Sequence, residues 1–200
     1  MAKPLKTSAP VRANHEIRII GGAWRRTRIA VRDLPGLRPT PDRVRETLFN
    51  WLGQDLSGWR CLDVFAGTGV LGLEAASRGA ADVVLVEQDR TLVEAIAAML
   101  LRLKAQGVRV VRGDGVATLR QSAPSSLDLV FVDPPFDAML FEPALRAAAA
   151  AVAPSGWVYL EAPLAWTDAS LAPFGLCVHR HLKAGAVHAH LLRRADPAHA

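Results

Sequence analysis

Residues 127–136, LDLVFVDPPF, run an apolar stretch directly into an aspartate, two prolines and a phenylalanine. Proline has a fixed φ and no N–H group, so Pro134 and Pro135 predict a rigid, extended loop immediately after a strand. In such a loop, Asp133 and the Pro134 carbonyl would be two fixed hydrogen-bond acceptors, and Phe136 would offer a face for stacking. A strand that simply ends at prolines would explain Pro134 and Pro135 but neither Asp133 nor Phe136. The segment therefore indicates a functional site.

Two acceptors beside an aromatic ring suit an amino group on a planar heterocycle. The lone pair of such an exocyclic amine is delocalised into the ring, so the nitrogen is a poor nucleophile. Acceptors that hold both N–H hydrogens would bring the nitrogen towards tetrahedral geometry and free its lone pair for attack. The predicted catalytic residues are therefore Asp133, Pro134, Pro135 and Phe136.

A second stretch, CLDVFAGTGVLGLEAA, places Gly67, Gly69 and Gly72 in a GxGxxG pattern after an apolar strand and before a helix. Glu87 follows at the end of the next predicted strand. A glycine turn of this kind lets the backbone approach a cofactor, and the acid accepts hydrogen bonds from ribose hydroxyls. An NAD-dependent oxidoreductase is therefore one interpretation.

The acidic residues around this loop favour a cationic cofactor instead. Asp63 ends the strand before the loop, where a carboxylate would repel a pyrophosphate at the helix N-terminus. Asp114 ends the third predicted strand in RGDG. Together with Glu87, these acids suit a ligand that carries both an adenosine group and a positive charge. S-adenosylmethionine is such a ligand. The alternative is that each acid caps the helix that follows it.

The elements that must position these residues begin at about residue 60, where short apolar strands alternate with helices. Such strands are typical of a parallel sheet covered on both faces. Two alternating segments around Gly185 predict a closing antiparallel pair. We expect an α/β fold with a Rossmann-like, doubly wound, seven-stranded sheet that binds ligands beyond the carboxyl ends of its strands. The predicted strands are CLDVFA, DVVLVE, VRVVRGD, LDLVFVD and WVYLEA, and the predicted helices span roughly 70–79, 90–105, 115–121 and 138–153.

The positive charge of the chain is concentrated in its first quarter. Residues 1–45 contain eleven lysine and arginine residues against three acidic residues, whereas the whole chain has a net charge of +5. Such asymmetry indicates a polyanionic partner for this segment. EIRIIGGAWRRTRIAV predicts a β-hairpin with a Gly-Gly turn. The candidate phosphate-binding residues are Arg18, Arg25, Arg26 and Arg28 on this hairpin, with Arg38 beyond it.

The segment TPDRVRETLFNWL predicts a helix with Thr40 as N-cap and Pro41 in the first helical position. We therefore divide the chain into a disordered tail (1–15), a hairpin plus helix that forms a lid over RNA and cofactor (16–56), and a main domain (57–195). Cys61 and Cys177 lack CxxC spacing, which predicts free thiols rather than a disulfide or a metal site. The N-terminus lacks the apolar region of a signal peptide and no stretch is long enough to cross a membrane, so we expect a cytoplasmic protein.

Several segments together resemble the RsmD-type bacterial 16S ribosomal RNA (guanine-N2) methyltransferases. VFVDPPF is similar to the amino-methyltransferase signature, in which Asp, Asn or Ser precedes Pro-Pro and an aromatic residue. LDVFAGTG is similar to the cofactor loop of class I methyltransferases that use S-adenosylmethionine. The more specific likeness is in IRIIGGAWRRTRIAV and GLRPTPDRVRETLFNWL, and it extends from residue 16 to about 194. It implies a class I methyltransferase, with an N-terminal basic β-hairpin extension, that methylates one guanine N2 of the guanine-966 type.

The resemblance also implies partners and binding residues. We expect S-adenosylmethionine as cofactor, 16S rRNA within the small ribosomal subunit as substrate, no metal and no membrane partner, and a monomer. Asp63 and the glycine loop would surround the methionine portion, Glu87 the ribose, and Asp114 the adenine. The full set of predicted cofactor-binding residues is Thr40, Arg43, Asp63, Phe65, Gly67, Gly69, Glu87, Gln88, Asp114 and Gly115.

Three other functions remain open at this point. An adenine-N6 DNA methyltransferase would use the same Asp-Pro-Pro-aromatic segment, although the N-terminal block and the small size of the chain argue against it. An NAD-dependent oxidoreductase and a non-catalytic RNA-binding protein are the alternatives from other classes.

Overall fold

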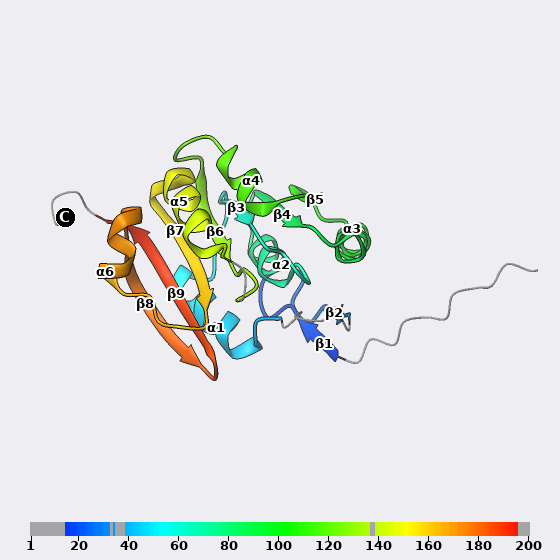
Figure 1. Ribbon diagram of the computed structural model, residues 1–200. Helices are drawn as coiled ribbons and strands as arrows, with labels where there is room; N and C mark the ends of the chain where they lie inside the picture. Colours follow the sequence, from blue (N-terminus) through cyan, green and yellow to red (C-terminus); the bar gives the residue numbers. More distant parts are fainter. Residues whose placement is uncertain (1–14, 33, 35–38, 137–138, 196–200) are drawn as a thin grey trace, which may run out of the picture.

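The computed structural model describes residues 15–32, 34, 39–136 and 139–195, and its centre is one seven-stranded sheet. The strand order is β5-β4-β3-β6-β7-β9-β8 (Figure 1). The first five strands of the sheet in sequence pair in parallel, and β9 runs antiparallel to both β7 and β8. This arrangement confirms the predicted doubly wound sheet with its closing pair. The strands are β3 (Arg60–Asp63), β4 (Asp82–Glu87), β5 (Val108–Arg112), β6 (Leu127–Val132), β7 (Val152–Ala162), β8 (Leu176–Ala184) and β9 (Val187–Arg194).

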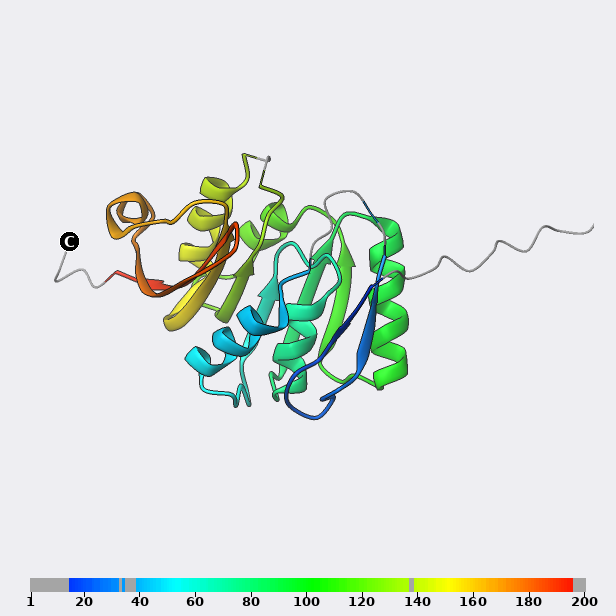
Figure 2. The same cartoon turned by 90° about the horizontal axis from the view of Figure 1, so that it is seen from below.

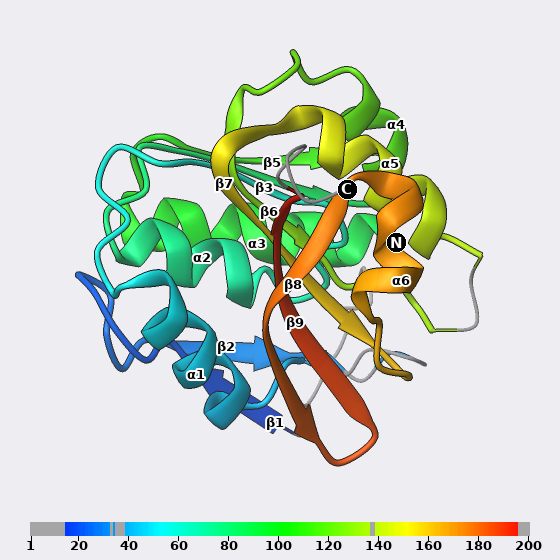
Figure 3. The same cartoon turned by 90° about the vertical axis from the view of Figure 1, so that its left-hand side faces the viewer.

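Helices cover both faces of the sheet, because the strand residues are apolar on both sides. Helices α1 (Asp42–Leu52), α2 (Val70–Ser77) and α3 (Arg90–Leu103) lie on one face, and α4 (Gly115–Arg120), α5 (Phe141–Ala151) and α6 (Asp168–Leu171) lie on the other (Figure 3). Leu85, Phe131 and Tyr159 belong to the apolar cluster under α1 to α3. Val86, Val130 and Leu160 belong to the cluster under α4 and α5. Alternate residues of each strand therefore serve two separate cores.

The N-terminal hairpin consists of β1 (His15–Arg18) and β2 (Arg28–Val31), and it lies beside α2 and α3 (Figure 2). The predicted Gly-Gly turn is wrong, because Arg18 pairs with Arg28 and residues 19–27 form a longer connection. This connection is docked on α2. The Ile20 and Gly21 amides donate to the Glu74 carboxylate, both at 2.8 Å, and the Ala23 amide donates to the Ser77 carbonyl at 2.7 Å.

Glu74 is the centre of a buried charged cluster that fixes this connection. Its side chain is fully buried and pairs with Arg45 of α1 at 3.2 Å and with Arg78 at 2.8 Å. Arg45 is also fully buried, and its Nε donates to the Thr40 carbonyl at 3.2 Å. Because buried charges are stabilised only by partners and hydrogen bonds, Glu74 depends on both arginines and on the backbone amides of Ile20 and Gly21. The cluster joins the hairpin connection, α1 and α2.

Helix α1 begins at Asp42, and its N-cap residue is Pro41, which was predicted one position later, as the first helical residue. The prediction that Thr40 caps this helix is wrong, since its hydroxyl donates instead to Glu161 at the end of β7, 2.6 Å away. Val44, Leu48 and Leu52 are buried and form the apolar face of the helix. Thr40 therefore connects the start of α1 to the sheet rather than to the helix that follows it.

Several predicted boundaries shift by a few residues. Helix α5 ends at Ala151, and β7 begins at Val152, well before the predicted WVYLEA strand. Both cysteines are free, as expected. None of the helices in the described part of the chain is long and apolar enough to span a bilayer.

Candidate active site

Four acidic residues lie at the ends of four adjacent strands and on one face of the sheet. Asp63 pairs with Leu85 of β4 and with Phe131 of β6, and Phe131 pairs with Tyr159 of β7. Side chains two residues apart on a strand point to the same face. The residues two positions beyond these partners therefore share the face of Asp63, on the side of α1 to α3. They are Glu87, Asp133 and Glu161.

Asp63 is buried, and only one of its two carboxylate oxygens accepts a hydrogen bond from the described residues. Its Oδ2 accepts a hydrogen bond from the Gly72 amide of α2 at 3.1 Å, and its Oδ1 has no hydrogen-bond partner among the described residues. Burial, together with the charges of Glu87 and Glu161, raises the pKa of the Asp63 carboxyl to about 7, and the backbone amides of Gly72 and Phe65 oppose this shift. A buried carboxylate oxygen without a donor fits a ligand that brings positive charge or an N–H group.

Glu87 supports the glycine loop. Its two carboxylate oxygens accept from the Gly67 amide at 2.8 Å and from the Asp89 amide at 2.9 Å. Gly67 and Gly69 have φ values of 54° and 79°, a region that favours glycine, so the loop needs glycine at both positions. Glu87 and the two glycines therefore come together at the end of β4, as predicted.

Asp114 departs from its predicted position. Strand β5 ends at Arg112, and Asp114 is the N-cap of α4, where its side chain accepts from the Ala117 amide at 2.9 Å. The helix-cap alternative therefore describes Asp114 correctly. A side chain at Gly115 would place a Cβ 1.8 Å from the Val64 carbonyl, so glycine there permits α4 to approach the end of β3.

The Asp-Pro-Pro-Phe segment leaves β6 at the same edge. Asp133 is half-buried and no hydrogen bond to its carboxylate is found within the described residues. Burial raises the pKa of the Asp133 carboxyl well above its ordinary value, and the charges of Glu161 and Asp63 raise it further. Pro134 is buried, Pro135 is exposed, and the Phe136 ring is 40% exposed with its centroid 6.4 Å from that of Phe141. Within the described residues, the segment therefore presents a carboxylate without a hydrogen-bond donor and an accessible aromatic face.

Glu161 was not predicted from the sequence, although it lies within this group of acids. Its Oε1 accepts from Thr40 at 2.6 Å and from the Tyr159 hydroxyl at 2.8 Å. Burial raises the pKa of Glu161, and these two hydroxyl donors oppose the shift. The signal was present in YLEA, where an acid follows an apolar strand as Asp63 and Glu87 do. Tyr159 carried no such signal, because a tyrosine in a strand is ordinary.

The remaining predicted residues are dispersed. Phe65 is half-buried just after β3, Gln88 is exposed after β4, and Arg43 is exposed on α1. Arg38 lies outside the described residues. The hairpin arginines are all exposed, and one of them pairs with Glu16 at 3.0 Å. These are Arg18, Arg25, Arg26 and Arg28, of which Arg28 forms the pair.

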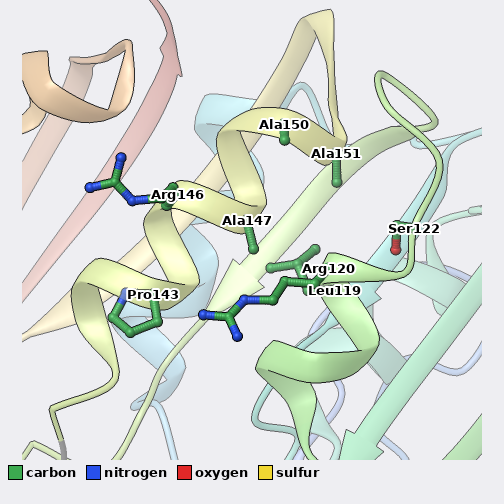
Figure 4. Close-up of a pocket in the computed structure, with 8 residues that line it drawn as sticks. All are labelled: Leu119, Arg120, Ser122, Pro143, Arg146, Ala147, Ala150 and Ala151. Carbon is green, nitrogen blue, oxygen red and sulfur yellow. The ribbon is translucent and has the colours of Figure 1, made fainter.

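A pocket of about 250 Å³ lies elsewhere, between α4 and α5 on the opposite face of the sheet (Figure 4). Its rim carries Arg120, Ser122 and Arg146, and its floor is formed largely by alanines. None of the acidic strand-end residues lines it. The acidic edge, and not this pocket, contains the predicted catalytic segment.

The strand order, the reversed strand β9 and the acidic carboxyl edge define a class I methyltransferase fold. The chain belongs to the family described as "Conserved hypothetical protein 95", which matches residues 17–193 and includes the RsmD-type enzymes. It is 42% identical over 185 residues to "Ribosomal RNA small subunit methyltransferase D" of Escherichia coli, covering 90% of each chain. A protein of the same name from Haemophilus influenzae is 43% identical over 136 residues, covering 66% of this chain and 70% of that protein.

Solved structures agree with this membership. The fold matches a structure described as a putative methyltransferase, YhhF, from Escherichia coli with a TM-score of 0.78 and 41% identity, over 90% of this chain and 99% of that one. It also matches a putative methylase, HI0767, from Haemophilus influenzae with a TM-score of 0.73 and 32% identity, over 91% and 100% of the two chains. Family membership decides against the NAD-dependent oxidoreductase.

Proposed function

We propose that the protein transfers a methyl group from S-adenosylmethionine to the exocyclic N2 of one guanine in 16S rRNA of the small ribosomal subunit. The observation that carries this proposal is the juxtaposition of the rigid Asp133–Phe136 segment with buried acids that have no cationic partner among the described residues. The name of the Escherichia coli relative supports the rRNA substrate.

The residues at this edge fit the cofactor. When bound, S-adenosylmethionine supplies a methyl group activated by a positively charged sulfur. The unpartnered Asp63 Oδ1 and the glycine loop suit its cationic methionine portion, and Glu87 lies where an acid can face a ribose. Thr40 is buried at the same edge, whereas the exposed Arg43 lies on α1, so a contact from Arg43 to the cofactor carboxylate remains a prediction.

The catalytic segment would position the amine. Asp133 and the Pro134 carbonyl accept hydrogen bonds from N2, and Phe136 stacks on the guanine. An unpaired base is the least costly to extrude from its stack, so we expect the target guanine in a loop. Positioning supplies most of the acceleration, because oriented reactants avoid a large entropic cost.

A methyl-transfer assay tests the proposed function. Tritiated S-adenosylmethionine is incubated with the protein and either small subunits that lack the modification, purified 16S rRNA or duplex DNA, and the modified base is then mapped. We expect label in one guanine N2 of the small subunit. Label in adenine N6 of DNA would support the DNA methyltransferase alternative, and no label with retained RNA binding would support the non-catalytic one.

Changing both Arg25 and Arg26 to alanine should weaken rRNA binding and leave cofactor affinity unchanged. Both side chains are exposed on the docked connection, and arginine–phosphate contacts position RNA without reading its sequence. Loss of two phosphate contacts should lower the slope of log K against log salt by roughly 1.4, at about 0.7 per contact for single strands. Filter binding at several salt concentrations measures this slope.

The matched control changes Arg180 and Arg193 to alanine, which removes the same charge from β8 and β9. This variant should keep the wild-type salt slope. Equal effects of the two double variants would show that only net charge matters and would contradict a specific role for the hairpin connection.

The affinity for S-adenosylmethionine should rise with pH around neutrality. The Asp63 carboxyl has a pKa of about 7 without ligand, so it is mainly neutral at pH 6 and mainly ionised at pH 8. The ionised form attracts a cationic ligand, which predicts about tenfold tighter binding across this range, since one proton is linked to binding. Calorimetry at each pH measures it. The Asp63→Asn variant should bind weakly with a flat pH dependence, and a flat profile in the wild type would contradict the assignment.

A further inference from the structure

Asp133 and Glu161 occupy neighbouring positions on neighbouring strands. The ladder between β6 and β7 ends with Val132 opposite Leu160, so Asp133 and Glu161 follow as the next two facing residues. Adjacent strands lie about 4.8 Å apart, and both side chains point to the face covered by α1 to α3. The two carboxyl groups therefore lie close together at the catalytic edge.

Glu161 is held more rigidly than Asp133. It is 3% exposed, and its Oε1 accepts from both the Thr40 and the Tyr159 hydroxyls. Thr40 is fixed in turn through its carbonyl, which accepts from the buried Arg45. Asp133, by contrast, has no hydrogen-bonding side chain of this kind within the described residues and can face a substrate.

The two carboxyl groups influence one another. Burial is the largest cause of the raised pKa of Asp133, and the charge of Glu161 is the second. The other groups facing this pair are Asp63 on β3, whose charge also raises the pKa of Asp133, and Tyr159, whose own pKa is raised by burial and by Glu161. Arg45 of α1 acts on Tyr159 in the opposite direction. Two carboxyl groups so close cannot both ionise freely, so they titrate as a pair.

We propose that Glu161 is a positioning residue that forms with Asp133 a carboxyl pair, and that this pair takes up the proton released by the substrate amine. The inference rests on the proposed function. In the transfer, the amine nitrogen forms a bond to the methyl carbon while the carbon–sulfur bond breaks, and sulfur keeps the electron pair. The nitrogen becomes positive and releases one N–H proton to Asp133. Glu161 does not touch the substrate, but its charge makes Asp133 a stronger base near neutral pH.

The test compares Glu161→Gln with Tyr159→Phe in single-turnover methyl transfer from pH 5 to 9. Glu161→Gln keeps an oxygen acceptor for both hydroxyls and removes the negative charge. Asp133 then ionises more readily, so the acidic limb of the rate profile should move to lower pH by about one unit, and the plateau should fall by less than about tenfold because the base is weaker. Tyr159→Phe removes a donor that stabilises ionised Glu161, so Glu161 carries less negative charge beside Asp133 and the limb should also move to lower pH, by less than in Glu161→Gln. A purely structural role for Glu161 would move neither limb.

A second measurement does not require turnover. Carboxyl ¹³C chemical shifts of the cofactor-free protein follow the titration of Asp133 directly, and Glu161→Gln should lower its apparent midpoint. If the wild-type protein methylates rRNA but Glu161→Gln changes neither the limb nor this midpoint, the carboxyl pair is refuted and the proposed function stands. If the wild-type protein transfers no methyl group, the proposed function fails, while the shifts still decide whether the pair exists. Should Glu161→Gln not fold, the downward shift in Tyr159→Phe remains the deciding result.

Discussion

Asp133→Ala is expected to lower the rate of methyl transfer by about 10²- to 10⁴-fold without abolishing cofactor binding. Asp133 follows β6 at the acidic edge, and its carboxylate has no hydrogen-bond donor in the described part of the chain, so it can accept from the substrate amine. Alanine removes this acceptor and leaves Asp63 and the glycine loop in place. Single-turnover transfer from tritiated S-adenosylmethionine measures the rate, and calorimetry measures cofactor binding.

The matched control is Glu142→Ala, which removes a carboxylate from the exposed first turn of α5, shortly after the catalytic segment. Its rate should remain close to that of the wild type. Asp133→Asn keeps one oxygen acceptor but cannot take up a proton, so its rate should lie between those of the alanine variant and the wild type. Unchanged turnover in Asp133→Ala would remove Asp133 from the mechanism.

Glu74→Ala should lower the free energy of unfolding by about 3–5 kcal/mol, the cost of removing one partner of a buried charged cluster. The substitution leaves fully buried Arg45 and nearly buried Arg78 without their shared carboxylate, and the amides of Ile20 and Gly21 lose their acceptor. Urea denaturation followed by circular dichroism measures this loss. We also expect protease cleavage in the connection 19–27 to accelerate, because it loses its attachment to α2.

Glu94→Ala is the corresponding control. Glu94 pairs with Arg90 at 2.7 Å, but both side chains are exposed, so the expected cost is below about 1 kcal/mol. Similar costs for the two substitutions would show that the buried cluster contributes no more than a surface ion pair.

The parallel sheet could be predicted because it follows from short sequence patterns, each of which spans one strand and the helix after it. Each strand in DVVLVE or LDLVFV is apolar on both faces, and each is followed by a helix, which permits few arrangements other than a parallel sheet. Because the carboxyl ends of parallel strands meet at one edge, Asp63, Glu87 and Asp133 could be placed together without coordinates. The register then shows that they share one face.

Two wrong predictions, the Gly-Gly turn and the Thr40 cap, concern residues whose partners lie far away in the sequence. Gly21 and Gly22 looked like a hairpin turn, but the backbone there bonds to Glu74 and Ser77, more than fifty positions away. Thr40 fitted the local pattern of a cap, yet its partner is Glu161. Local sequence preferences cannot reveal a hydrogen-bond acceptor so far along the chain. When such an acceptor is present, the long-range hydrogen bond forms instead of the local turn or cap. Asp114 is the opposite case: its side chain caps the helix that begins three residues or fewer away, so its partner could be expected from the local sequence.

One continuous series of polar contacts runs from the hairpin connection through Glu74 and Arg45 to Thr40 and Glu161. An engineer who wished to transplant the basic arm onto another methyltransferase could not cut the chain before α1 and move the hairpin alone. The recipient would also need counterparts of the acid on α2 and of the glutamate that ends β7. Without them, the grafted arm would lack the hydrogen-bond partners that attach it to the main domain.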